Sequence, residues 1–204
     1  MSTVTPTTSK PWTTLRKFVR TPVQRIERCE LCGAPIPPEH DHVIELNNRQ
    51  LQCSCMACAI LFCDQGNQRF RRVPRRCDVL HDFRLDDSTW ESFLIPINLA
   101  FFFRHSAHER VVAMYPSPAG ATESLLELDT WDELGEANPI LRQFAPDIEA
   151  LLVNRVGSSR DYYRVSIDRC YELVGLIRLR WRGLSGGNTV WEEIAKFFQK
   201  LQAA

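Results

Sequence analysis

The sequence has no excess of charge of either sign and no long hydrophobic run. Its 25 Lys and Arg side chains balance 25 Asp and Glu side chains, so no global field draws the chain to nucleic acid or to an anionic membrane. No apolar run approaches the roughly 18 residues that a membrane-spanning helix needs. The first ten residues are rich in Thr and Ser and lack the apolar stretch of a secretory signal. We therefore expect a cytoplasmic protein without membrane insertion.

Cysteine, in contrast, is abundant for a chain of this length. The 204 residues include eight cysteines, and six of them lie between Cys29 and Cys63. A reducing cytosol keeps thiols from forming stable disulfides, so a dense group of cysteines is better explained by metal binding. The isolated Cys170 falls on an apolar helical stripe and is expected to be a core thiol.

Two Cys-x-x-Cys pairs give the strongest chemical signal. Cys29 and Cys32 form the first pair, which Gly33 follows, and Cys55 and Cys58 form the second. A spacing of two residues lets both sulfurs of a turn, or knuckle, face one ion, and glycine lets the backbone fold back towards them. The pairs are separated by 22 residues, close to the spacing of about 15–20 found in zinc sites. Four thiolates in a tetrahedron favour Zn²⁺, and we predict these four ligands.

The ligand set and the metal both have alternatives. Cys53 could replace Cys55, and His40 or His42 could replace a sulfur. Iron is the alternative metal, because Cys-x-x-Cys-Gly also opens a rubredoxin knuckle. Such a site would be redox-active, but Ala59 follows the second pair where a rubredoxin-like knuckle would have glycine.

A partial resemblance to the HNH nucleases concerns the same segment. The two cysteine pairs and the intervening residues 41–44 (DHVI) resemble their zinc-braced ββα element, which implies that His42 would activate water. Ala59 stands where those enzymes have Asn or His, and we identify no ligands for a catalytic metal. The basic cluster from Arg69 to Arg76 could contact phosphate, but zero net charge favours a solvated linker or a protein contact. A degenerate nucleic-acid-binding protein is kept only as an alternative.

Composition divides the chain into three parts. Residues 1–26 are rich in Pro and Thr and predict a flexible tail, with a helical turn or two at 12–19. Residues 27–76, called the cysteine module below, are expected to form a small metal-binding module of the zinc-ribbon or knuckle type with a basic linker. Residues 77–204, where cysteines are rare and apolar runs such as INLAFFF (97–103) begin, predict a separate domain.

Strand pairs followed by helices indicate an α+β fold, with an antiparallel sheet closed by two C-terminal helices. The predicted strands are 42–46, 49–52, 97–103, 110–115, 148–153 and 162–167. His105 and His108 are expected on the surface of the loop between the third and fourth of these.

Helices are expected over 130–136, from near Ser88, over 167–181 and from 189 to 201. Asp86 or Asp87 would cap the second of these, and Thr189 with Glu192 would form a capping box at the start of the last. The loop Gly183–Gly187 is interpreted as a tight link between helices rather than a phosphate site.

Longer stretches resemble an uncharacterised bacterial family of domains of unknown function. The matching segments are ERCELCG (27–33), PPEHDH (37–42), CSCMAC (53–58), AFFF (100–103), GATESLL (120–126), ALLVNR (150–155), CYELVGLI (170–177) and WRGLSGG (181–187). The resemblance implies genes that lie beside those of nickel–iron hydrogenases and no assigned activity. It therefore implies a protein partner, a hydrogenase subunit or precursor, and an accessory role without catalytic residues.

Overall fold

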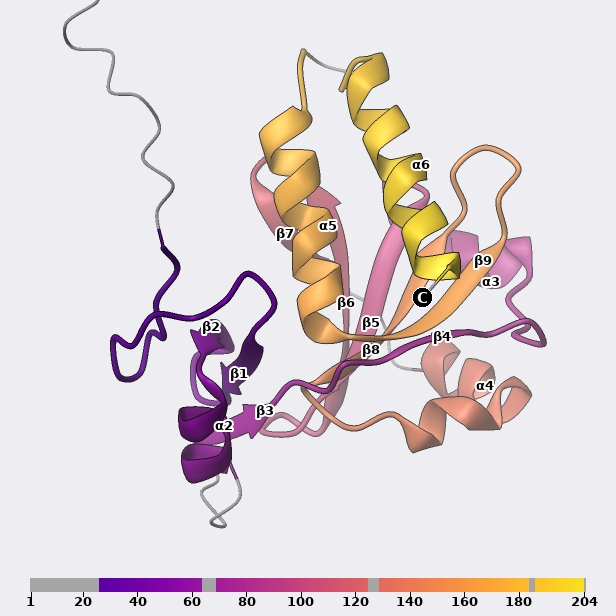
Figure 1. The fold of residues 1–204 in the computed structure, drawn as a ribbon. Coiled ribbons are helices and arrows are strands. Elements are labelled where there is room, and N and C mark those ends of the chain that lie inside the picture. Colours follow the sequence, from indigo (N-terminus) through magenta and orange to yellow (C-terminus); the bar gives the residue numbers. More distant parts are fainter. Residues whose placement is uncertain (1–25, 64–68, 125–128, 184–185, 204) are drawn as a thin grey trace, which may run out of the picture.

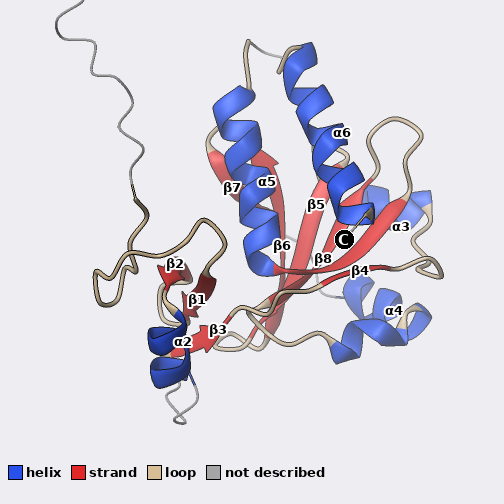
Figure 2. Cartoon of the chain, in the orientation of Figure 1, coloured by secondary structure: helices blue, strands red, loops and turns tan. Residues whose placement is uncertain are grey.

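The computed structural model describes residues 26–63, 69–124, 129–183 and 186–203. They form an α+β fold with two antiparallel sheets, as predicted (Figures 1 and 2). The predicted tail lies outside the described residues except for Ile26. In the part of the chain that is described, no helix is both long and apolar enough to cross a membrane.

The smaller sheet belongs to the cysteine module. Its three strands, in the order β2-β1-β3, are β1 (Asp41–Glu45), β2 (Gln50–Ser54) and β3 (Phe70–Arg72). The predicted hairpin is confirmed, because β1 and β2 pair from Asp41 opposite Ser54 to Glu45 opposite Gln50. Helix α2 (Met56–Cys63) follows β2 directly and was not predicted, because its apolar residues run without helical periodicity.

The larger sheet has six strands in the order β4-β9-β8-β5-β6-β7. They are β4 (Cys77–Val79), β5 (Leu99–His105), β6 (Arg110–Ser117), β7 (Gly120–Ser124), β8 (Glu149–Asn154) and β9 (Asp161–Ser166). The β5–β6 and β8–β9 pairs were predicted, and the pairing of β5 with β8 joins them into one sheet. The edge strands β4 and β7 were missed because short edge strands have little apolar alternation.

Helices cover both faces of this sheet. On one face lie α5 (Ile167–Arg180) and α6 (Asn188–Gln202), which pack on Phe101, Phe103 and the other residues of that face (Figure 1). On the opposite face Phe102 and Ala100 pack with residues of α3 (Asp87–Ser92), α4 (Asp129–Ala137) and the 3₁₀ turn η2 (Pro139–Gln143). Burial on both faces explains the continuous apolar run in β5.

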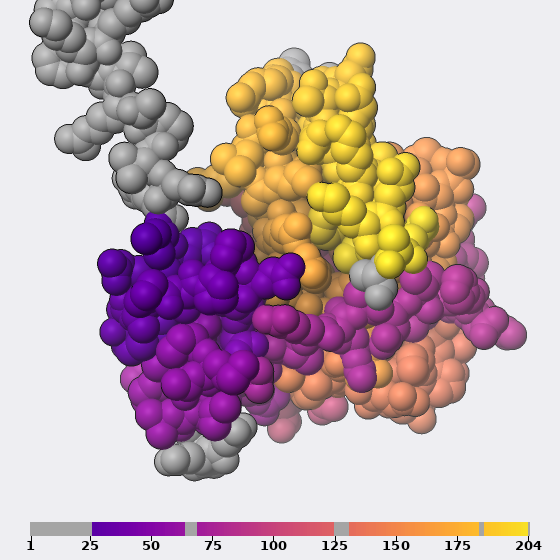
Figure 3. All heavy atoms as spheres, in the orientation of Figure 1, coloured from indigo at the N-terminus to yellow at the C-terminus, as the bar shows by residue number. Residues whose placement is uncertain are grey.

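The cysteine module contacts the start of α5 through His42 and Asp168, and the segment before β8 through Arg71 and Asp147 (Figure 3). Ile44 of β1 and Val73, just after β3, are buried in the same core as the α5–α6 face of the large sheet. Because these residues belong to one core, the two sheets share it. The chain then continues from β3 into β4 of the large sheet. The division of the chain at residue 76 stays a prediction.

Two local predictions were wrong. His105 is the last residue of β5 and is only 5% exposed, because β5 pairs with β6 up to His105 opposite Arg110. Helix α6 begins at Asn188 with Gly187 as N-cap and no side-chain capping bond, so the predicted capping box at Thr189 does not form. Asp86, in contrast, caps α3 as predicted by accepting a hydrogen bond from the Thr89 amide at 2.7 Å.

Candidate metal centre

The first cysteine pair lies on a tight turn. The Gly33 amide donates to the Cys29 carbonyl at 2.8 Å, and the Cys29 amide donates to the Ala34 carbonyl at 2.8 Å. Gly33 has φ of +76°, a conformation that favours glycine, and this allows the chain to fold back. The Glu30 amide donates to the Cys53 carbonyl at 2.9 Å, which holds the knuckle against β2.

The second pair lies at the start of a helix. Cys55 comes directly before α2, where its carbonyl accepts from the Ala59 amide at 2.9 Å, and Cys58 lies in the first turn. The Cys58 amide donates to Cys55 Sγ at 3.4 Å. The positive end of the helix dipole favours thiolates at this position. The module thus combines a knuckle, a hairpin and a helix.

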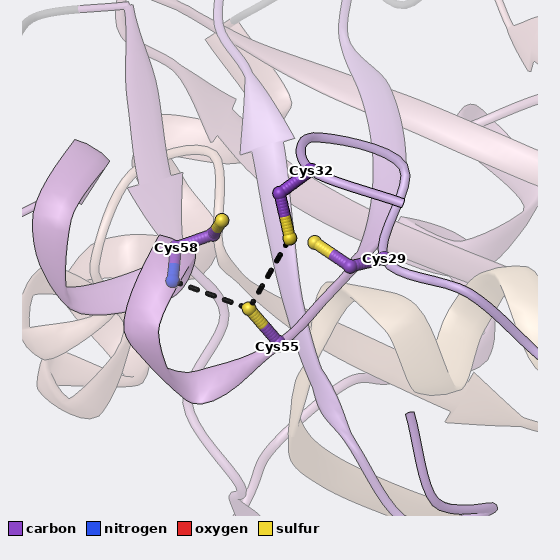
Figure 4. A group of neighbouring side chains, drawn as sticks. All are labelled: Cys29, Cys32, Cys55 and Cys58. Atoms are coloured by element: carbon purple, nitrogen blue, oxygen red, sulfur yellow. Dashed lines mark hydrogen bonds between the residues drawn. The ribbon is translucent and has the colours of Figure 1, made fainter. Parts of the chain in front are cut away.

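The hairpin brings the two pairs together. The sulfur atoms of Cys29, Cys32, Cys55 and Cys58, the four-cysteine cluster, all lie within 4.8 Å of one another (Figure 4). Cys32 Sγ and Cys55 Sγ are 3.8 Å apart. A tetrahedral Zn²⁺ with Zn–S bonds of about 2.3 Å needs S–S separations of about 3.8 Å. The four predicted ligands could therefore hold one metal ion without a large rearrangement.

The cluster already favours a thiolate at one position. Burial opposes ionisation of Cys29, but hydrogen bonds from the backbone amides of Cys55, Cys32 and Leu31 outweigh it and lower the Cys29 pKa to about 6. Burial raises the pKa of Cys58 instead, and hydrogen bonds with the neighbouring sulfurs raise it further. Four thiolates at these distances need a cation to offset their mutual repulsion.

The alternative ligands do not join this cluster. The ligand atoms of His40, His42 and Cys53 lie within 4.8 Å of one another in a second group, called the His–Cys cluster below. The sequence contained a signal for this group, because His40 and His42 are two residues apart and an extended chain places such side chains on one side. The third member, Cys53, joins the group through the register of β1 and β2, which places it directly opposite His42.

Four arginines of the basic cluster form ion pairs that connect elements. Arg69 pairs with Glu45 at 2.7 Å, Arg71 with Asp147 at 3.2 Å, Arg72 with Asp41 at 3.1 Å and Arg76 with Glu149 at 3.2 Å. Arg71 and Arg76 thereby join the cysteine module and its linker to the large sheet. Positive charges that are already paired contribute less to phosphate binding, which weakens the nucleic-acid alternative.

The fold and the cluster define a class of protein. It is an α+β protein whose N-terminal knuckle, hairpin and helix place four cysteines around a position where one metal ion could bind. The chain belongs to a family of unknown function, DUF5947, whose model matches residues 28–204. Searches of curated proteins and of solved structures find no match.

Proposed function

We propose that this protein is a zinc-braced accessory protein that acts by binding another protein and has no catalytic activity of its own. The proposal of a zinc site rests on the four cysteine sulfur atoms, which all lie within 4.8 Å of one another. A closed set of four thiolates is the structural form of a zinc site, because it leaves no position for a substrate. Iron at the same cysteines is the alternative and would make the protein an electron carrier.

The cysteine module has a clear need for such a brace. Its own cores are small: one contains Cys29, Ile36 and Cys58, and the other contains Val43, Ala59 and Phe70. Modules of this size bury too little apolar surface to fold on hydrophobic contacts alone, and a metal ion commonly supplies the missing free energy. Structural Zn²⁺ contributes on the order of 10–16 kcal/mol in small zinc domains at neutral pH.

Elemental analysis and a visible spectrum test this role. Untagged protein purified without added metal should be colourless and contain zinc that survives dialysis. Cys32→Ser should lose one equivalent of that zinc, whereas Cys63→Ser, at the end of α2 and outside both cysteine clusters, should keep it. Stoichiometric iron with thiolate-to-iron absorption would support the redox alternative. Absence of any bound metal from anaerobically prepared protein would contradict the proposal.

Hydrogen exchange shows whether the metal acts as a brace. Removing zinc with a chelator should abolish amide protection in β1, β2 and α2 while β5, β8 and β9, in the large core, stay protected. Unchanged protection of the cysteine module after metal removal would contradict the bracing role.

An exposed apolar surface on α2 supports the protein-binding part. Met56, Ile60 and Leu61 are 66%, 46% and 53% exposed, and they lie on a helix whose other side covers the four-cysteine cluster and the hairpin. Exposed apolar side chains that lie together indicate a contact with another protein. The partner that the family resemblance implies is a nickel–iron hydrogenase subunit or precursor.

Co-purification from cells that produce the native hydrogenase tests the partner. We expect the hydrogenase subunit to be retained by the wild type and lost with Ile60→Glu combined with Leu61→Glu. Leu94→Glu and Leu179→Glu are matched controls, because both side chains are exposed, at 80% and 73%, but lie elsewhere on the fold. Hydrogenase assembly and activity that remain intact after deletion of this protein would contradict the assignment.

A further inference from the structure

The His–Cys cluster has the geometry of a second metal site. His42 in β1 is directly opposite Cys53 in β2, and His40 lies two residues before His42 on the same side. The two imidazole rings are edge to face with centroids 4.8 Å apart. One nitrogen from each ring and the Cys53 sulfur all lie within 4.8 Å of one another, which is close enough for contact with a single ion.

Both histidines are held in the form that a metal requires. His40 Nδ1 is 2.9 Å from the Pro37 carbonyl, and His42 Nδ1 is 2.8 Å from Asp168 Oδ2. A carbonyl and a carboxylate accept hydrogen bonds, so both Nδ1 atoms carry the proton. The lone pair of each neutral ring is therefore on Nε2. A histidine that binds a metal almost always donates its other N–H to such a partner, which orients the ring and raises its basicity.

His40 provides an independent observation that points to a bound metal ion. Its side chain is only 7% exposed, yet Nε2 is buried without a hydrogen-bond partner. A buried acceptor without a partner is uncommon because burial removes its bond to water. A cation at the position shared with His42 and Cys53 would satisfy this nitrogen.

The cluster borders a groove between the cysteine module and the start of α5. The groove has a volume of about 1070 Å³, and its lining includes His40, His42, Asp168, Glu172 and Cys77. His42, whose side chain is 27% exposed, therefore connects the cluster with a space that water or a small ligand can enter. The four-cysteine cluster contributes nothing to this lining.

We propose that His40, His42 and Cys53 bind a second metal ion, distinct from the one in the four-cysteine cluster, with its fourth coordination position open to the groove. Two imidazoles and one thiolate suit a borderline divalent ion of the Zn²⁺ class and disfavour Mg²⁺ and Ca²⁺. Binding releases the thiol proton of Cys53 to solvent, since the thiolate is the ligand and both imidazoles bind as neutral rings. Three protein ligands and one open position are typical of zinc sites that bind an exchangeable water or a small ligand. The site does not depend on the nature of the protein partner.

Equilibrium dialysis of the full chain against Zn²⁺, followed by elemental analysis, tests the proposal. The wild type should retain two Zn²⁺ per chain. His40→Gln and Cys53→Ser should each retain one. The matched controls His108→Gln, an exposed histidine, and Cys63→Ser should retain two. A single Zn²⁺ in the wild type at saturating metal, or two in both cluster variants, would overturn the proposal.

Asp168→Asn gives a second test that leaves all three ligands in place. Loss of a partner that orients a ligand typically weakens metal binding by about 10- to 100-fold. We expect that change in the affinity for the second Zn²⁺ and no change for the first. Substitution with Co²⁺ distinguishes the two sites, because an all-thiolate site absorbs more strongly from sulfur-to-metal charge transfer than a site with one sulfur. An unchanged affinity of the second ion in Asp168→Asn would contradict the assignment even if the ligand variants fail to fold.

Discussion

Arg71 Nη1 lies 3.2 Å from Asp147 Oδ2, and this ion pair joins β3 of the cysteine module to the segment before β8. The Asp147 side chain is almost fully buried, and its Oδ1 accepts from the Ser106 amide at 2.9 Å. Arg71 also donates to the Pro146 carbonyl at 2.9 Å. One arginine thus offsets a buried carboxylate and positions the module on the large sheet.

Arg71→Gln should lower the free energy of unfolding by about 2 kcal/mol, because it leaves the Asp147 carboxylate buried without its cation. Arg71 is itself 38% exposed, so the cost should stay below that of breaking a fully buried pair. Urea unfolding of zinc-loaded protein measures the change, with the exposed Arg84→Gln as control. A double-mutant cycle with Asp147→Asn should show coupling, and strictly additive effects would contradict a direct pair.

Glu149 is the most heavily bonded carboxylate in the large sheet. It is 3% exposed, accepts from Arg164 at 2.6 Å and from the Ala145 amide at 2.7 Å, and pairs with Arg76 at 3.2 Å. Glu149→Gln keeps the shape of the side chain but leaves the buried Arg164 without a counter-charge, so stability should fall by about 3 kcal/mol or more. Denaturant unfolding measures this, and Glu136→Gln on exposed α4 should be neutral. A loss below about 1 kcal/mol would show that solvent already screens Arg164.

His105 should make stability depend on pH. Burial lowers its pKa, and the positive charges of Arg49, His108 and Arg110 lower it further, against the opposing charge of Asp147. The unfolded chain, with a histidine pKa of about 6.5, then binds a proton at a higher pH than the folded chain does. The contribution of neutral His105 is therefore complete above about pH 6.5 and decreases as the pH falls towards the folded pKa.

Unfolding measurements from pH 7.5 down to pH 5, which is about 1.5 pH units below the histidine pKa of the unfolded chain, test this. The stability of the wild type should fall more steeply with decreasing pH than that of His105→Leu, while the exposed His81→Gln should follow the wild type. Taking the difference between variants removes effects of pH on metal binding. Parallel curves for the wild type and His105→Leu would contradict a lowered pKa.

Among the described glycines of the link between α5 and α6, Gly186 occupies the most restricted position. Its φ is +86°, and a Cβ there would lie 2.8 Å from Val190 Cγ1 and 3.1 Å from the Trp181 ring. Gly186→Ala should therefore cost about 2–4 kcal/mol from backbone strain and overpacking. Gly183→Ala, at φ of +64° with nothing within 4 Å, should cost only about 1 kcal/mol. Thermal unfolding compares the two, and equal losses would show that the contact with Val190 relaxes.

Sequence patterns predicted the parts of the fold that leave a local signal. The two C-terminal helices were found because their apolar residues repeat at helical spacing, and the central strands because short apolar runs are bounded by polar turns. Helix α2 was missed because Ala59, Ile60, Leu61 and Phe62 are all apolar, so no periodicity distinguishes a helix from a strand. His105 was assigned to a loop because the segment around Asp147, which is distant in sequence, packs against the end of β5.

By itself, the sequence determined the α+β class and the two Cys-x-x-Cys pairs, since a turn with this spacing brings two sulfurs together whatever surrounds it. Only the tertiary structure decided which candidate metal ligands belong to the four-cysteine cluster and which belong to the His–Cys cluster. The chain turns from β2 into α2 after Ser54, so Cys55 joins the knuckle while Cys53 stays on the strand opposite His42. The hydrogen bond from His42 to Asp168 spans 126 residues. Such contacts depend on strand register and on the packing of distant elements, and no local pattern encodes them.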